Sequence, residues 1–384
     1  MTGKIDLSEL KYISDSFVVP PEKIAIRGTV LMCMANGSKS HLGKVALVDE
    51  DYGYAFGGFM GLIVPSSDIV PSYLYWILSG YGFKRLIESL TDGANINNLK
   101  FADIAGFEFP LPPLPVQREI VARLERELGA VDKLAKKFEE LEAAAKAEFK
   151  AELKETFEEI KHRGEMHRRS FASEGRFGEA EPEGRASVCE TQRLGDVCTL
   201  LTDGDWIESK DQSPDGIRLV QTGNVGFGRF ENKEKHSRFI TVDTFRRLRC
   251  TEIFPGDVLI SRLPDPVGRA CIVPDIGQRM ITAVDCSIAR FDERVDTEYF
   301  VLYSQSLQYD FAISEKLTGS TRQRISRSNL SQIEIPVPSF AVQREVVARL
   351  DAAKAKKEKL VAAARRGCET AALMRKAILK EAFE

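Results

Sequence analysis

The stretch PLPPLPVQREIVARL (110–124) occurs a second time in this chain, as PVPSFAVQREVVARL (336–350). The residues Gln-Arg-Glu and Ala-Arg-Leu of the first copy recur in the second at a constant offset of 226. This period is far longer than the roughly 20 to 50 residues of a solenoid repeat. The sequence therefore predicts a duplicated domain, each copy of which ends in a proline-rich turn that leads into a helix.

Each proline-rich turn is followed by a long helical pattern, because the prolines hold the chain extended only up to that point. Apolar residues recur every three or four positions from Ile120 to Ile160 and again from Val346 to Ile378. The second stripe keeps heptad spacing throughout. We expect the contacts between the helices to include Leu124, Val131, Phe138, Leu350, Leu360 and Met374.

The two helices are too long for a compact core. A helix of about 45 residues reaches roughly 65 Å, whereas an ordinary globular helix has three or four turns. Each apolar stripe needs a partner, and the other copy supplies one, so we expect an antiparallel coiled coil. Lys357 and Gly367 stand in the second stripe and are expected to weaken it. The alternative is two unrelated amphipathic helices on separate domains.

Composition sets only broad limits on the class of protein. A chain of 384 residues can hold two or three domains, and its net charge of −3 favours no particular partner. Seven cysteines without a C-x-x-C motif, and four scattered histidines, indicate a reduced, cytoplasmic protein without a structural metal. No apolar run approaches the length of a membrane span, and no signal peptide is recognised.

The duplication extends beyond the helices to the globular parts. Short β-type runs followed by helical segments occur in the same order in both copies. The fold class predicted is α+β, with two similar mixed α/β domains joined by two long helices. The matching pairs are RGTVLMC (27–33) with PGDVLIS (255–261), GKVALVD (43–49) with GRACIVP (268–274), and SYLYWILSGYGFKRLI (72–87) with EYFVLYSQSLQYDFAI (298–313).

The copies differ at their front ends. The second copy opens with about 45 residues that have no match in the first, so either Met1 is a truncated or internal start or the first domain has degenerated. A Gly-, Ser-, Glu- and Arg-rich segment between the copies is typical of a flexible linker. The expected parts are a first domain (1–110), a first helix (111–162), the linker (163–190), a second domain (191–339) and a second helix (340–384).

Motifs for catalysis fail at named positions. In GSKSHLGKV (37–45), five residues separate Gly37 from Gly43, and Val45 stands where a phosphate loop needs Ser or Thr. Neither an amino-methyltransferase tetrapeptide nor the acidic-x-Lys unit of a metal-dependent nuclease is found. The chain is therefore predicted to be non-catalytic and to use no cofactor.

The segment TGSTRQRISRSNL (318–330) has side chains suited to DNA, with three arginines and no acid. Arginine pairs with guanine, Gln and Asn pair with adenine, and hydroxyl groups suit phosphates. The same place in the first copy, DGANINNLK (92–100), is rich in Asn; the alternative for each residue is a solvated face. The candidate DNA-binding residues are Arg262, Ser320, Thr321, Arg322, Gln323, Arg324 and Arg327 in the second copy and Asn95, Asn97 and Asn98 in the first.

A strand of the form I-x-I-P-x-P before an AVQREVVARL helix, together with RLGDV, TDGDW and PGDVLIS, resembles the DNA-specificity subunit of type I restriction-modification enzymes. The resemblance implies that each domain is a target-recognition domain reading one half of a bipartite site in double-stranded DNA. It implies that the helices are spacers that dock two methyltransferase subunits. Adenine methylation and ATP-dependent cleavage would belong to partners, the latter to a motor and nuclease subunit.

The shortened front of the first copy departs from the family pattern. It predicts that residues 1–110 read DNA less specifically than residues 191–340. Two alternatives remain open: an orphan or degenerate adaptor that holds a different partner, and a coiled-coil scaffold that binds DNA only at the salt-sensitive background level.

Overall fold

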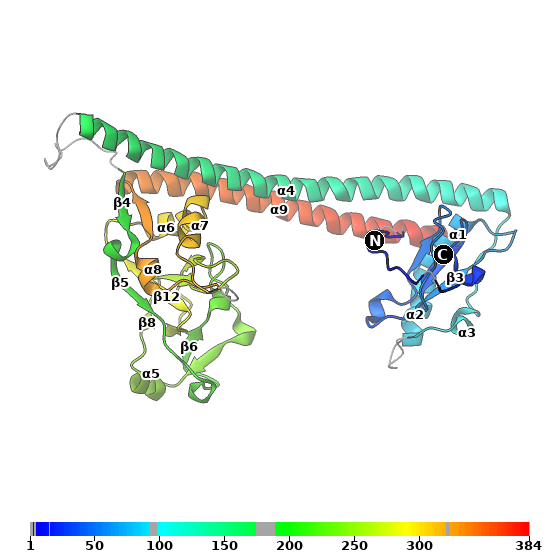
Figure 1. Ribbon diagram of the computed structural model, residues 1–384, viewed down its shortest axis with the longest axis horizontal. Helices are drawn as coiled ribbons and strands as arrows, with labels where there is room; N and C mark the ends of the chain where they lie inside the picture. Colours follow the sequence, from blue (N-terminus) through cyan, green and yellow to red (C-terminus); the bar gives the residue numbers. More distant parts are fainter. Residues whose placement is uncertain are drawn as a thin grey trace. The chain divides into compact units, whose positions relative to one another are not determined.

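The computed structural model describes residues 3, 5–14, 16–91, 98–173, 189–319 and 323–383. It divides into two units, Met1–Glu142 with Ala362–Glu384, and Ala143–Val361 (Figure 1). Each unit contains one globular domain and one stretch of paired helices. Five of the predicted DNA-binding residues lie outside the described residues, namely Asn95, Asn97, Ser320, Thr321 and Arg322.

The domain of the first unit is built on a three-stranded antiparallel sheet with the order β2-β1-β3. Helices cover one face of this sheet, where Val30 and Met32 of the central strand pack against Leu74 and Phe83. The elements are η1 (Pro21–Lys23), β1 (Val30–Cys33), η2 (Lys39–His41), β2 (Val45–Leu47), β3 (Met60–Ile63), α1 (Pro71–Ser79), α2 (Tyr81–Thr91) and α3 (Phe101–Ile104).

The domain of the second unit has a four-stranded sheet of order β10-β9-β12-β5, another of order β7-β6-β11-β8, and a β13-β4 pair. All these pairings are antiparallel except that of β6 with β11. The central strand β9 is buried along its whole length because layers cover both of its faces. The strands are β4 (Glu190–Arg193), β5 (Cys198–Asp203), β6 (Ile217–Val220), β7 (Arg238–Ile240), β8 (Glu252–Ile253), β9 (Val258–Ser261), β10 (Ala270–Ile272), β11 (Met280–Thr282), β12 (Cys286–Phe291) and β13 (Glu334–Val337).

The helices of this domain begin at residues whose side chains accept a backbone N–H of the first turn. Thr241, Asp296, Ser306 and Ser326 cap the four short helices in this way. The helical elements are η3 (Leu194–Val197), η4 (Ser209–Asp211), η5 (Thr222–Asn224), η6 (Glu234–His236), α5 (Val242–Leu248), α6 (Thr297–Tyr303), α7 (Leu307–Ser314) and α8 (Arg327–Ser331).

The two domains share one scaffold, which confirms the predicted duplication. The order β2-β1-β3 reproduces β10-β9-β12, and α1 and α2 correspond to α6 and α7. Gly43 and Gly268 both have positive φ, at 70° and 87°. A Cβ at Gly43 would lie 2.6 Å from Ile87, and one at Gly268 would lie 2.9 Å from Ile313. Each turn therefore requires glycine, both because of its positive φ and because a Cβ would collide with an isoleucine.

The repeated VQRE sequence has a structural explanation in its glutamine. Gln343 is fully buried, donates to the carbonyls of Arg294 and Pro338, and accepts from the N–H of Asp296, each at 2.8 Å. Gln117 makes the equivalent three bonds, to Asp68, Pro112 and Val70, also at 2.8 Å. In each copy this glutamine, near the start of the long helix, joins the proline-rich turn to the residues just before α1 or α6.

The long helices are α4 (Leu114–Ser173) and α9 (Phe340–Phe383). Figure 1 shows them side by side, and ion pairs join them within each unit. As residue numbers rise along α9, their partners on α4 fall, which confirms the antiparallel coiled coil. The pairs are Arg349 with Glu152 and Glu159, and Lys356 with Glu148, in the second unit, and Arg365 with Glu142, and Arg375 with Asp132, in the first.

Each domain also packs against the far end of the helix that follows the other copy. In the second unit, the ring of Phe157 from α4 meets Tyr299 edge to face, with centroids 5.7 Å apart. In the first unit, Phe383 from α9 meets Tyr73 at 5.8 Å. Both contacts join aromatic rings at favourable distance and angle. Both cores are therefore completed by a residue distant in sequence.

Three residues of the paired helices have surroundings that the apolar stripe alone does not predict. Gly367 does not weaken the pair, because Phe138 occupies its missing side chain: a Cβ there would lie 2.5 Å from the ring. Lys357 lies over the ring of Phe149, with its Nζ 4.2 Å from the centroid, so its charge is accommodated. Met374 is 44% exposed, whereas Ala371, one turn earlier, is buried.

The predicted linker begins too early. Helix α4 continues to Ser173, so residues 163–173 are helical. Gly164 costs the helix only about 1 kcal/mol. A Cβ at Gly164 would lie 3.0 Å from the carbonyl oxygen of Cys189, so the glycine lets the chain entering β4 approach closely.

Candidate nucleic-acid interface

Arg262, which follows β9, is held inside the second domain. Its guanidinium donates to the carboxylate of Asp203 at 3.1 Å and to the carbonyl of Val284 at 2.9 Å, and its side chain is only 14% exposed. The same carboxylate accepts a hydrogen bond from Ser287 at 2.9 Å. Arg262 therefore links β5, β9 and the turn before β12, and its side chain lies largely below the protein surface.

The base of the predicted DNA-binding loop is hydrogen-bonded to Arg262. Thr318 and Arg324 exchange two backbone hydrogen bonds of 2.9 Å, which closes the loop at its base. The next residue, Ile325, is fully buried and its N–H donates to the carbonyl of Arg262 at 3.3 Å. Gln323 and Arg324 are exposed. The base of the loop is thus fixed by backbone hydrogen bonds, while the side chains of Gln323 and Arg324 face solvent.

Arg327 and Asn98 are the other predicted residues that the structure describes. Arg327 is exposed, and its guanidinium reaches the hydroxyl of Thr202 at 3.5 Å, so it lies beside the end of β5. Asn98 belongs to the first domain, where it is exposed and forms an antiparallel bridge with Ala35. The second domain therefore carries Gln323, Arg324 and Arg327 close together in sequence, and the first domain carries Asn98.

Trp206 is an exposed aromatic residue that sequence reasoning missed. In TDGDW, a side chain at Gly204 would collide with the carbonyls of Thr282 and Ala283, so only glycine fits. Asp205 accepts the N–H of Thr251 at 2.9 Å, and burial raises the pKa of its carboxyl. These constraints present Trp206 to solvent with 72% of its surface exposed. The signal available in the sequence was the tryptophan that ends TDGDW, after two aspartates.

Arg269 is a second residue whose role the sequence did not reveal. It is buried, and it donates to the carbonyls of Thr222 and Val225 at 3.0 and 2.7 Å. It also donates to the carbonyls of Leu263, Pro264 and Pro266, at 3.1, 2.7 and 3.0 Å. Burial lowers the pKa of its guanidinium. Arg269 therefore holds two loops together, one of which follows directly from Arg262.

The sequence of the chain matches a family model described as the type I restriction modification DNA specificity domain, over residues 15–143 and 187–363. The chain belongs to this family. The two matched regions correspond to the two copies of the duplicated specificity domain. The chain is similar to the EcoKI specificity subunit of Escherichia coli K12, to which it is 32% identical over 139 residues. That alignment covers 36% of this chain and only 30% of the relative.

A longer alignment joins the chain to the putative MjaX specificity subunit of Methanocaldococcus jannaschii, at 25% identity over 91% of this chain and 77% of that one. Among solved structures, a chain from a study of complex assembly and conformational transition of the type I R-M system superposes with a TM-score of 0.72. It is 20% identical, and the match covers 95% of this chain and 84% of that one. The HsdS subunit of Thermoanaerobacter tengcongensis gives 0.53, also at 20% identity, over 95% and 83%. At these identities the superpositions show the shared fold.

Other arginines of the second specificity domain are partly committed to ion pairs. Arg247 binds the carboxylate of Asp211 at 2.5 Å, which lowers the pKa of that carboxyl. Arg249 ends α5 in the left-handed conformation, with φ of 54°. Of the three neighbouring residues Arg246, Arg247 and Arg249, the first and the last are exposed, and no ion pair of theirs is found among the described residues.

Two buried thiols of the second specificity domain have raised pKa values. Burial raises the pKa of Cys271 to about 12 and that of Cys286 to about 11, so both stay protonated near neutral pH. Within the described ranges, no group of three His, Cys, Asp or Glu side chains is placed to hold a metal ion. In the same ranges, no helix has both the length and the apolar character needed to cross a membrane.

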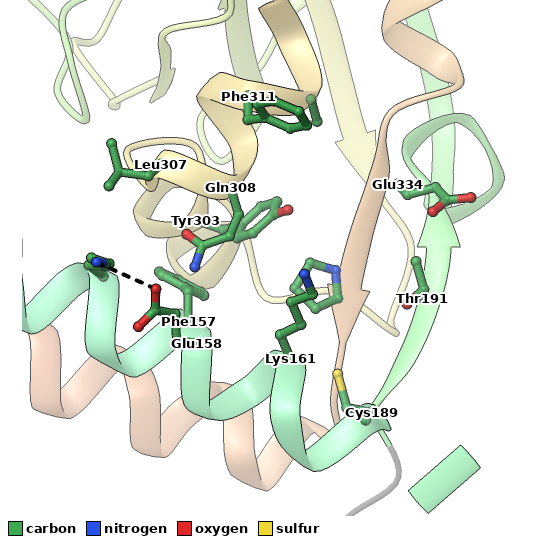
Figure 2. Close-up of a pocket in the computed structure, with 14 residues that line it drawn as sticks. Phe157, Glu158, Lys161, Cys189, Thr191, Tyr303, Leu307, Gln308, Phe311 and Glu334 are labelled. Carbon is green, nitrogen blue, oxygen red and sulfur yellow. Dashed lines mark ion pairs between the residues drawn. The ribbon is translucent and has the colours of Figure 1, made fainter. Parts of the chain in front are cut away.

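A cavity of about 530 Å³ lies in the second unit, where α4 meets the specificity domain. Figure 2 shows Phe157 and Tyr303 on its inner side, with Thr191 and Glu334 across from them on the β4 and β13 strands. Glu158 pairs with Lys154 at 3.7 Å at its mouth. None of the predicted DNA-binding residues lines this cavity. It is a feature of the junction between helix and domain.

Proposed function

We propose that this chain is the specificity subunit of a type I restriction-modification complex, in which two domains each read one half of a bipartite site in double-stranded DNA. Residues 1–110 and 191–339 are the proposed recognition domains. Family membership and the duplicated scaffold support the proposal. The observation that carries it is the pair of exposed side chains Gln323 and Arg324, next to the backbone hydrogen bonds that join Thr318 and Arg324.

Direct reading is assigned to the loop and its neighbour on α8. Arg324 and Arg327 carry forked donors suited to guanine, and Gln323 carries the amide suited to adenine. The sequence adds Ser320, Thr321 and Arg322 to the same loop. Trp206 offers an apolar face that can stack on or wedge between bases.

Arg262 and Arg269 are given a different role in this proposal. Arg262 supports the base of the Arg324 loop, and Arg269 fixes the loops at 222–225 and 263–266. A reading loop must hold its donors within a narrow range of positions to discriminate bases. These two arginines thus act on specificity by keeping loops in place, without contacting bases.

The paired helices are proposed to serve as the docking surface for two methyltransferase subunits and to separate the recognition domains. Their outward faces carry alternating Lys and Glu, as expected for solvated or partner-bound helices. In this proposal the chain is not an enzyme: adenine methylation and ATP-dependent cleavage take place on partner subunits, the latter on a motor and nuclease subunit.

The first prediction tests the Arg324 loop. Arg324→Ala should weaken binding to the cognate site by roughly 1 to 3 kcal/mol, or about 5- to 150-fold, because a bidentate base contact is lost. Binding to unrelated DNA should change little. Competition binding at fixed salt, in the assembled complex, measures both affinities.

The matched control is Arg85→Ala, which removes the same charge from an exposed position on α2, outside the loop and the two long helices. It should leave sequence discrimination unchanged. If Arg324→Ala weakens binding to all sequences equally and lowers the salt slope by about one, Arg324 contacts a phosphate. Unchanged affinity for every sequence would refute the assignment of the loop to DNA.

A further inference from the structure

The cavity of the second unit, at the junction of α4 with the specificity domain, has a smaller counterpart in the first unit. This first-unit cavity of about 90 Å³ lies between α9, α2 and residues 107–110. A buried water needs only roughly 10 to 15 Å³ of such space, so both cavities have room for a side chain. Each cavity lies entirely within its own unit.

The two cavities are lined at equivalent positions of the duplicated scaffold. In each, a long helix supplies a phenylalanine, and the chain leading to the other long helix supplies a glutamate and a proline. The matching residues, each pair separated by the offset of 226, are Phe157 and Phe383, Glu334 and Glu108, and Pro336 and Pro110. The chain therefore carries the same cavity twice, once in each unit.

An exposed apolar residue that begins a short helix lines each cavity. Leu307 begins α7 and is 45% exposed, and its counterpart Tyr81 begins α2 and is 50% exposed. Phe311, one turn after Leu307, is 64% exposed. Figure 2 shows Leu307 and Phe311 on α7 across from Phe157 and Lys161 on α4. Exposed apolar side chains that gather in this way mark interaction sites, whereas single scattered ones do not.

The walls of the second-unit cavity determine which chemistry it accepts. Its inner side is formed by the rings of Phe157 and Tyr303, which meet edge to face with centroids 5.2 Å apart. Burial raises the pKa of the Tyr303 hydroxyl, so this group stays neutral. The charges of Lys154 and Glu158 offset each other at the mouth. An apolar interior with a charged rim suits a large apolar side chain of a protein partner.

The duplication indicates what kind of partner binds. A site that occurs once in each copy of a duplicated scaffold suits a partner that binds twice through the same surface. The methyltransferase subunit is such a partner in the proposed function, where two subunits dock on the long helices. Those helices also form part of both cavities, α4 in the second unit and α9 in the first.

We propose that each cavity receives a large apolar side chain from one methyltransferase subunit. Each subunit is then anchored where helix meets domain, in addition to its contacts along the helices. A single apolar side chain in a desolvated pocket commonly supplies a large share of the binding energy of an interface. This anchoring rests on the part of the proposed function that docks two methyltransferase subunits, and it is independent of how the loops read DNA.

The test counts the methyltransferase subunits that the full chain binds tightly. Titration with the subunit, followed by native mass spectrometry, should give two for the unchanged chain. Leu307→Glu and Tyr81→Glu should each leave one, because affinity at the altered cavity falls by about 30-fold or more. The double variant should leave none. A glutamate is favourable at the first position of a helix, so these variants keep their fold.

Val242→Glu is the matched control. Val242 is 41% exposed, begins α5 and lines neither cavity, so this variant should still bind two subunits. Leu307→Lys separates apolar burial from charge, and should lose one subunit just as Leu307→Glu does.

Two tightly bound subunits in both glutamate variants overturn the anchoring and leave docking along the helices in place. Full binding by Leu307→Lys also overturns it, because charge at the rim would then explain the loss in Leu307→Glu. An unchanged chain that binds no subunit would instead refute the proposed docking itself, and the anchoring with it.

Discussion

Buried polar side chains in both domains act as ties between segments of backbone. Gln117 and Gln343 each hold three backbone groups, and Arg269 holds five carbonyls. A sequence shows that such residues are polar, but not whether their donors point inward or outward. Arg262 was therefore assigned to DNA on composition alone, although its guanidinium is bound to Asp203. Trp206 was missed because the sequence does not show whether an aromatic side chain is buried or exposed.

The second prediction concerns the repeated glutamine. Gln343→Leu leaves the N–H of Asp296 and the carbonyls of Arg294 and Pro338 without partners. It should lower the free energy of unfolding of the second domain by roughly 2 to 5 kcal/mol. Denaturant unfolding followed by circular dichroism measures the loss. Glu345→Ala, an exposed substitution two residues away, should change stability by less than about 0.5 kcal/mol; equal effects from both would contradict the role given to Gln343.

At the scale of elements, the heptad stripe predicted the helices and their pairing but not the detail of each contact. Spacing of three and four residues identifies the face of a helix. It does not show that Gly367 receives the ring of Phe138, or that Lys357 lies on Phe149, because these depend on the opposing residue. The end of α4 was misjudged because Gly164 is tolerated where Cys189 approaches.

The third prediction compares two helical glycines. Gly→Ala in a helix normally stabilises it by about 1 kcal/mol. Gly129→Ala should show this gain, because a Cβ there has nothing within 4 Å. Gly367→Ala should instead destabilise the first unit by roughly 1 to 3 kcal/mol, because the new methyl group meets Phe138. Thermal unfolding of both variants gives the comparison, and a stabilising effect at both positions would show that the Phe138 contact is not tight.

At the scale of the whole molecule, the duplication was the most predictable property, because it is written in the sequence at a constant offset. The matching of GKVALVD with GRACIVP predicted two similar domains, and both carry the same strand order. The sequence also showed that the front segment has no match in the first copy.

The fourth prediction concerns this inequality between the domains. In a scan of single base substitutions, discrimination at the half-site that the proposed function assigns to residues 191–340 should reach roughly 1 to 3 kcal/mol per position. Discrimination at the other half-site should be weaker, because the described residues of the first domain include no counterparts of β5 and β6. Equal discrimination at both half-sites would contradict it. Binding is measured at a single stated salt concentration, since phosphate contacts depend on it.

The contacts of Phe157 with Tyr299 and of Phe383 with Tyr73 bear on how such a gene can exchange parts with its relatives. A crossover between the two repeats would separate each ring from the tyrosine it packs on, and would bring together helix ends and domains with no shared history. Crossovers within residues 198–291 leave α6 and both long helices in place, and so keep the contact of Phe157 with Tyr299 native. New target preferences should therefore arise by exchange of interiors, with the helical residues inherited as one block.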